Sequence, residues 1–181
     1  MAGAYPTDHV LDPVAVVEWG IDHGVYDLMY SAWGWPVVEV LHFFGLCLLI
    51  GTVGAFDLAM IGWVRGIKLS ALHRLVPFGV AGFCLSVATG ALFVIAAPDQ
   101  YLYNPAFQVK MALMAVAGAN MALFYLTAAR RVAAMGESER PPLAARLFAA
   151  LSLTSWFGVI MAGRVITAFR PPSWFWCAWC G

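Results

Sequence analysis

Charged residues are scarce in this chain of 181 residues: only 11% are Asp, Glu, Lys or Arg, whereas 62% are hydrophobic. The 10 basic and 10 acidic side chains balance to a formal net charge of +0, without any block of Lys and Arg. Nucleic-acid binding depends on clustered basic side chains that contact phosphates, so this composition argues against a nucleic-acid partner. Little charge and a mean hydropathy of +0.80 instead predict an integral membrane protein that is surrounded by the lipid bilayer.

Other features are missing as well. The sequence has no recognisable pair of a nucleophile and an adjacent base, and no phosphate-binding loop, which favours a protein that is not an enzyme by itself. The first ten residues have neither the basic nor the apolar region of a cleavable signal peptide, so we expect the mature chain to keep them.

Long apolar stretches are present at about residues 35–64, 71–97, 106–129 and 147–169. A helix needs about 20 apolar residues to cross the core of a bilayer. We therefore predict an all-α membrane protein with four transmembrane helices in an antiparallel bundle, over residues 35–169. Before it, residues 1–34 are expected to form a periplasmic tail and an amphipathic surface helix that starts near Pro13. Residues 170–181 are expected to form a periplasmic tail rich in Trp and Cys.

The basic residues predict the orientation of the bundle. They gather in the loops after the first and third apolar stretches: Arg65, Lys68, Arg74, Arg130, Arg131, Arg140 and Arg146. Outside the spans, the opposite side has only Arg170. The positive-inside rule then places these two loops in the cytoplasm. We expect a multi-pass protein of the bacterial inner membrane with both termini in the periplasm.

Ionisable side chains inside a span are costly, so they are candidates for function or for buried pairs. Glu39 and His42 lie one turn apart, and Lys110 and Arg164 reach a similar depth from other spans, about 9 Å from the outer end. Two interpretations are open. In the first, Glu39 pairs with Lys110 or Arg164, and His42 is a hydrogen-bonded residue of a layer that locks the bundle. In the second, His42 is an axial ligand of haem or copper or binds a quinone head, and the two cations hold an anionic group.

A haem with two histidine ligands needs both imidazoles at one depth on facing helices. His42 and His73 are predicted on opposite sides of the membrane, so they cannot serve one haem. A second imidazole would have to come from His9, His23 or another subunit.

Four further polar or sulfur-containing residues have simpler expectations. Asp57, near the cytoplasmic side, should form a structural ion pair with Arg74. Asn120 should hydrogen-bond a neighbouring helix. Cys47 and Cys84 lie in apolar helices and should be small core residues.

The chain ends in the sequence CAWCG, which contains Cys177 and Cys180. A c-type haem attachment site requires a histidine directly after the second cysteine, and none follows here. A disulfide or an inert pair is one interpretation of the two thiols, and binding of Cu(I), which prefers sulfur ligands, is the other.

Short motifs in the spans carry a resemblance: HFFGLCLLIG, ATGAL, NPAFQVKMAL and AGRVITA. Together they resemble an uncharacterised family of bacterial four-helix inner-membrane proteins and, more distantly, the membrane domain of the copper-resistance protein D family. The resemblance implies periplasmic copper handling or a b-type haem. We expect a haem- or copper-binding electron-transfer protein with its site near the periplasm. The alternative is a non-catalytic accessory subunit of a larger respiratory, photosynthetic or dehydrogenase complex, with other membrane subunits or copies of itself as partners.

Overall fold

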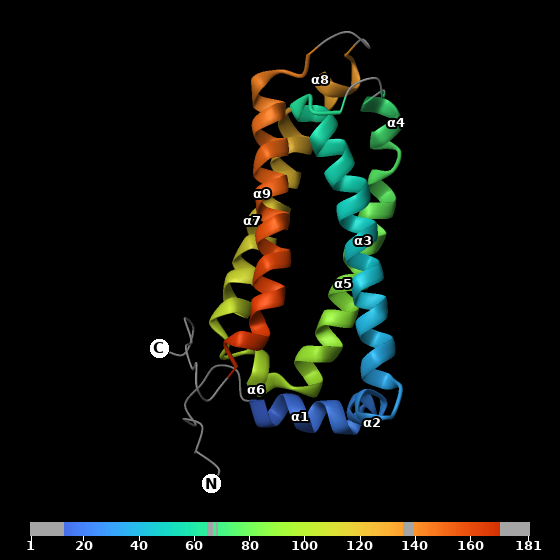
Figure 1. The fold of residues 1–181 in the computed structure, drawn as a ribbon, viewed down its shortest axis with the longest axis vertical. Coiled ribbons are helices and arrows are strands. Elements are labelled where there is room, and N and C mark those ends of the chain that lie inside the picture. The colour runs from blue at the N-terminus through green and yellow to red at the C-terminus, as the bar shows by residue number, and fades with distance from the viewer. Residues whose placement is uncertain (1–12, 65–66, 68, 136–139, 171–181) are drawn as a thin grey trace.

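The computed structural model describes residues 13–64, 67, 69–135 and 140–170. All regular structure within these residues is helical. The four long helices are α3 (Gly34–Ile61), α5 (Val76–Ala96), α7 (Pro105–Thr127) and α9 (Leu143–Val165). They run side by side along the long axis of the molecule (Figure 1), and each belongs to a segment that is long and apolar enough to cross a membrane. The predicted all-α bundle with four transmembrane helices is confirmed, and the chain is a multi-pass integral membrane protein.

The bundle consists of two helical hairpins. Helix α5 packs against α3, α9 packs against α7, and contact between α3 and α9 joins the hairpins. Glycines allow α3 and α5 to approach closely: a Cβ atom on Gly45 would lie 2.7 Å from the carbonyl oxygen of Gly82, and one on Gly82 would lie 2.6 Å from that of Gly45. Neither helix tolerates a side chain at this point, so the two glycines define where the helices cross.

Local sequence explains where the helices end. Helix α3 stops at Ile61, short of the predicted residue 64, because Gly62 adopts a left-handed conformation with φ of 97°. The second span is interrupted between α4 (Leu69–His73) and α5, where Pro77 lacks the N–H group that a continuous helix would need. Helix α7 starts after Asn104, whose side chain accepts hydrogen bonds from two backbone N–H groups of the first turn.

Three short helices lie across one end of the bundle (Figure 1): α1 (Pro13–Asp22), α2 (Val25–Tyr30) and α6 (Pro98–Tyr101). The predicted single surface helix is divided in two at Gly24, which has a φ of 69°. The hydroxyl of Tyr30 donates to the carbonyl of Ala96 at 3.1 Å and fastens α2 to the end of α5. We name this the α1/α2 end, and the opposite end, which carries α4 and α8 (Ala129–Ala133), the α4/α8 end.

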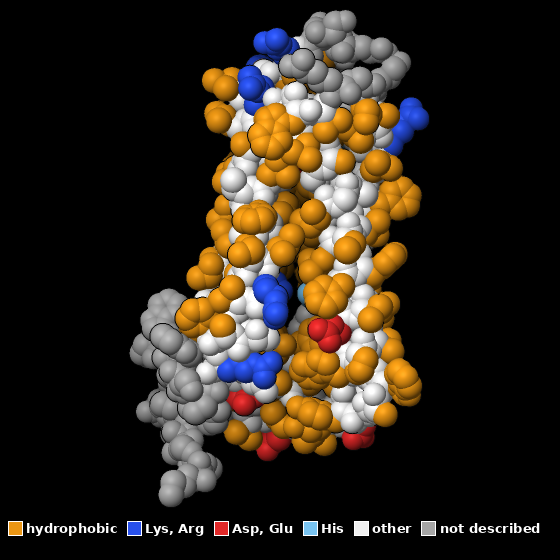
Figure 2. Space-filling model, viewed as in Figure 1, with side chains coloured by type: hydrophobic (Ala, Val, Ile, Leu, Met, Phe, Trp, Pro, Cys, Tyr) orange, Lys and Arg blue, Asp and Glu red, His pale blue; other side chains and the backbone are white. Residues whose placement is uncertain are grey.

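The long faces of the molecule are apolar. Hydrophobic side chains cover the sides of the bundle in Figure 2; Lys and Arg lie at the α4/α8 end and also on the lower part of this face, whereas Asp and Glu lie towards the α1/α2 end. Each end also has its own core, centred on Phe56, Met60 and Phe124 near α4 and α8, and on Met29 and Phe93 near α1 and α2. This distribution suits a protein with lipid around its middle and water at its two ends.

Candidate functional site

The close crossing of α3 and α5 brings His42 against Thr89. Nδ1 of His42 lies 2.9 Å from Oγ1 of Thr89. The Thr89 hydroxyl also lies within hydrogen-bond distance of two carbonyls of its own helix, that of Leu85 at 2.7 Å and that of Ser86 at 3.2 Å. With its one proton donated to either carbonyl, Oγ1 accepts from His42, and the hydrogen of the neutral imidazole is on Nδ1. In the neutral ring, Nε2 then carries the free lone pair.

Aromatic side chains pack around the His42 ring, but no polar group contacts its Nε2 atom within the described residues. Phe93 and Phe43 meet the imidazole edge to face, with ring centroids 5.8 Å and 6.4 Å away. Gly90 leaves space beside it, since a Cβ atom there would lie 3.6 Å from Cε1 of His42. Among the described residues, no donor or acceptor contacts Nε2. The ring is held through Nδ1, and its other nitrogen is available to a ligand.

Lys110 reaches the same region from the other hairpin. Its side chain lies along Gly163 of α9, where a Cβ atom would be 3.7 Å from Nζ. The ammonium group is close enough to act electrostatically on His42. Lys110 is half-buried and makes no hydrogen bond or ion pair with any described residue. The Lys110 ammonium group and the His42 imidazole thus lie in the same region, between the two hairpins.

The other two residues of the predicted layer, Glu39 and Arg164, lie on the surface of the bundle. Glu39 and Arg164 are both exposed, and within the described part of the chain no ion pair joins Glu39 to Lys110 or Arg164. The predicted pairing of Glu39 is wrong, because its side chain faces outward near the α1/α2 end. There it acts on Tyr101 of α6: burial raises the pKa of this phenol, Arg170 lowers it, and Glu39 raises it further.

The other described histidines are engaged elsewhere. His23 stacks on Trp19 with ring centroids 4.2 Å apart, and its Nδ1 lies 2.8 Å from the Trp19 carbonyl oxygen. His73, in α4 at the far end of the bundle, has its Nε2 3.2 Å from the hydroxyl of Tyr125. The described residues hold no group of three or more His, Cys, Asp or Glu side chains suited to a metal ion. His9, Cys177 and Cys180, which were candidate ligands, lie outside the described residues.

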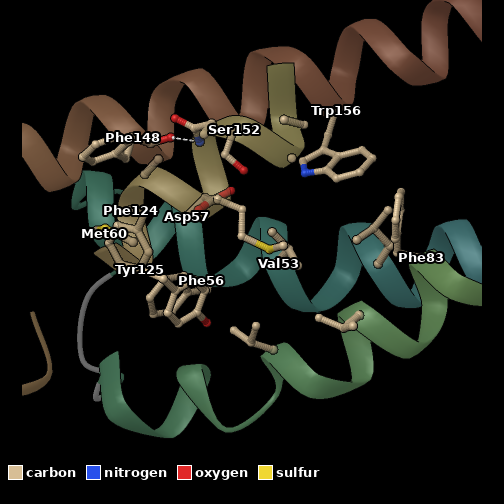
Figure 3. Close-up of a pocket in the computed structure, with 18 of the residues that line it drawn as sticks. Val53, Phe56, Asp57, Met60, Phe83, Phe124, Tyr125, Phe148, Ser152 and Trp156 are labelled. Atoms are coloured by element: carbon tan, nitrogen blue, oxygen red, sulfur yellow. Dashed lines mark hydrogen bonds between the residues drawn. The ribbon is translucent and has the colours of Figure 1, made fainter. Parts of the chain in front are cut away.

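The environment of Asp57 differs from the predicted one. Asp57 is only 4% exposed and lies beside Ser152 of α9, whereas Arg74 is exposed beyond the end of α4. Figure 3 shows Asp57 and Ser152 side by side, between Phe148 and Trp156. The predicted ion pair with Arg74 is therefore wrong: Asp57 faces the centre of the bundle.

The structure also decides three simpler expectations. Asn120 donates from Nδ2 to the carbonyl of Phe148 at 3.0 Å, which confirms its predicted bond to a neighbouring helix. Cys47 and Cys84 are exposed, so the prediction that they are core residues is wrong. Both are apolar enough for a surface that faces lipid.

The sequence contained a signal for Thr89 that a search limited to ionisable residues missed. Thr89 lies seven residues before the outer end of α5, and His42 lies eight residues after the outer start of α3. By the rise of about 1.5 Å per residue, both are about 11 Å from the α1/α2 end. A depth comparison that included hydroxyl side chains would have paired them.

Comparison with known protein families, with curated protein sequences and with solved structures found no match for this chain. What the protein does must therefore be inferred from the chemistry of its own residues.

Proposed function

We propose that this membrane protein binds a b-type haem through Nε2 of His42 and acts in electron transfer. The observation that carries the proposal is the contact of 2.9 Å between Nδ1 of His42 and Oγ1 of Thr89, which leaves Nε2 without a partner among the described residues. Histidines that bind metals commonly donate their other ring N–H to an acceptor, which fixes the tautomer and the orientation of the ring. The Thr89 hydroxyl is such an acceptor.

Lys110 supports the same assignment. A cation inside a membrane span is costly unless it meets an anion, and within the described residues Lys110 has no such partner. Haem carries propionate groups, and one of them would supply the missing negative charge. Arg164 follows Gly163, where Lys110 packs, and lies on the exposed side of the same turn, from which it would serve a second carboxylate.

Haem suits this site better than a bare copper ion. Haem brings four nitrogen ligands of its own, so one imidazole is enough to anchor it, whereas copper needs several protein ligands. Copper at His42 would need further ligands from outside the described residues, such as Cys177 and Cys180, or from another subunit. Copper, which the resemblance to the copper-resistance protein D family implies, is therefore the alternative outcome of the test below.

The residues of the chain would have four tasks. His42 would hold the haem, Thr89 would keep the ring in its coordinating orientation, and Lys110 would bind a propionate. Phe43 and Phe93 would exclude water from the ring edges. The bound haem would supply one-electron chemistry, whose potential depends on the axial ligand and on the polarity around it.

We also propose that the haem lies in the periplasmic half of the bacterial inner membrane. Exposed basic residues of the α4/α8 end, among them Arg74, Arg130, Arg131 and Arg146, support a cytoplasmic position for that end. The α1/α2 end, close to His42, would then face the periplasm. Reporter fusions at residue 138 and at the C-terminus should give cytoplasmic and periplasmic signals, respectively.

The decisive experiment is an optical spectrum and metal analysis of protein purified from its native membrane in mild detergent. We expect a Soret band with about one haem per chain. His42→Ala should remove the band, whereas the matched variants His23→Ala and His73→Ala should retain it, since those rings are engaged at other places in the fold.

Two results would contradict the haem assignment. Stoichiometric copper without a Soret band would replace haem by copper. A colourless protein without metal, unchanged by His42→Ala, would overturn cofactor binding altogether. In that case the accessory-subunit alternative predicts co-migration with a larger complex in native detergent extracts.

A further inference from the structure

A cavity of about 110 Å³ lies between the four spans in the half of the bundle nearer the α4/α8 end. All four long helices contribute to its wall, which is mostly apolar (Figure 3). The site proposed for haem is at the other end of α3, so this cavity is a separate feature.

Two oxygen atoms in the residues that line this cavity lack a partner. Asp57 is 4% exposed and Asn120 is 5% exposed, and both line the cavity. Nδ2 of Asn120 donates to the carbonyl of Phe148, but Oδ2 of Asp57 and Oδ1 of Asn120 have no hydrogen-bond partner among the described residues. Buried acceptors are normally satisfied, so these two atoms call for a donor that the described residues do not supply.

The chemistry of the wall indicates what kind of donor fits. A buried carboxylate favours a positive charge, which the described lining residues do not provide. Aromatic side chains, including Phe56, Tyr125 and Trp156, line the same space, and ring faces attract cations. Water would satisfy the two acceptors, but it would not compensate the charge of an ionised Asp57.

The geometry points to a binding site for a small lipophilic ammonium compound. Its N–H groups would donate to Oδ2 of Asp57 and Oδ1 of Asn120, and its apolar body would contact the aromatic wall. The site is independent of the haem proposed at His42.

Size and access are consistent with such a ligand. A benzene ring fits an apolar cavity of about 150 Å³. This cavity, of about 110 Å³, is smaller but open on one side, so part of an aromatic ring would extend into the opening. The exposed lining residues are Val80 in α5 and Gly118, Met121 and Tyr125 in α7. The opening therefore lies along the seam between α5 and α7, where a ligand dissolved in the membrane would enter.

The test is binding of benzylamine to the purified full-length protein in lipid nanodiscs, measured by saturation-transfer NMR, with benzyl alcohol as the neutral probe of similar shape. We expect saturable binding of benzylamine and at least tenfold weaker binding of benzyl alcohol. Asp57→Asn should weaken benzylamine binding at least tenfold, whereas Asp22→Asn, at an exposed position on α1, should leave it unchanged.

A second variant keeps the proposal falsifiable if Asp57→Asn does not fold. Gly118 lines the cavity, and a Cβ atom there would meet nothing within 4 Å, so Gly118→Leu should fold and reduce binding by filling the opening. Absence of saturable benzylamine binding would overturn the site. Equal binding of the alcohol, or binding unaffected by both variants, would overturn the role of the carboxylate. Asp57→Asn should leave the Soret band intact, which separates this test from that of the haem.

Discussion

Nδ1 of His42 in α3 lies 2.9 Å from Oγ1 of Thr89 in α5, and this contact joins the two helices of the first hairpin at the depth of the candidate site. The hydroxyl of Ser86, one turn earlier in α5, donates to the backbone carbonyl of His42 at 3.4 Å. The imidazole is thus positioned by a neighbouring helix that already packs closely on its own, and its orientation depends on that packing.

Thr89→Val should weaken cofactor binding without removing the ligand. The valine has nearly the same shape but cannot accept from His42, so the ring loses its fixed orientation. Loss of such an outer partner commonly lowers metal affinity by about 10–100-fold, and we expect a loss of that size in a haem titration followed by the Soret band. The control is Thr154→Val, because the Thr154 hydroxyl is exposed and bonds only within α9. Equal affinity in both variants would show that Thr89 does not orient the ring.

Gly45→Ala should destabilise the first hairpin. The new methyl group would lie 2.6 Å from Oγ of Ser86 and 2.7 Å from the backbone carbonyl oxygen of Gly82, so α3 and α5 would have to separate. Overpacking of this kind typically costs about 1–3 kcal/mol, and we expect a lower midpoint in detergent unfolding. Gly51→Ala is the matched control, since a Cβ atom there meets nothing within 4 Å and alanine favours helix. A destabilisation as large in Gly51→Ala would refute the explanation by close packing.

Asn104→Ala should destabilise the second hairpin. The side chain is 0% exposed, caps α7 by accepting from the backbone N–H of Ala106, and donates from Nδ2 to the carbonyl of Ile166 beyond α9. Loss of a cap costs about 1 kcal/mol, and a buried acceptor left without a donor costs about 1–3 kcal/mol. Asn104→Ser keeps the cap and should recover only the smaller part of the free energy of unfolding. If both variants unfolded at the same point, the bond to Ile166 would contribute nothing.

Tyr101 should make stability fall at alkaline pH. Burial raises the pKa of its phenol above the usual value of about 10, because the folded state favours the neutral form. The corresponding stability is present below pH about 10 and is lost as pH rises through the raised pKa of the folded protein. Tyr101→Phe should remove this part of the pH dependence, measured by unfolding and phenolate absorbance. Glu39→Gln should lower the pKa of Tyr101, since the carboxylate opposes its ionisation; a higher pKa in that variant would contradict the proximity of the two groups.

Much of the fold follows from the sequence because a bilayer restricts the choices. Apolar stretches long enough to span a membrane can hardly adopt another structure there, since every backbone N–H and C=O group must be satisfied within the segment. The helix boundaries also have local signals, Gly62 after α3, Pro77 at the start of α5 and Asn104 before α7. Gly24 is likewise a local signal for the point at which the surface helix divides into α1 and α2.

The direction in which each polar side chain points could not be read in this way. Depth along a helix follows from counting residues, and it placed His42 and Lys110 in one layer. Rotation about the helix axis depends on neighbours distant in sequence: Asp57 faces Ser152 rather than Arg74, and Glu39 faces outward.

The sequence alone determined that this is a membrane protein of four helices with ionisable groups at two depths. The tertiary structure decided which of those groups meet. The close crossing at Gly45 and Gly82 sets His42 against Thr89, and the contact between α3 and α9 sets Asp57 against Ser152. The physical reason is that helix formation is local and follows from composition, whereas the relative rotation of packed helices is fixed only when their side chains fit together.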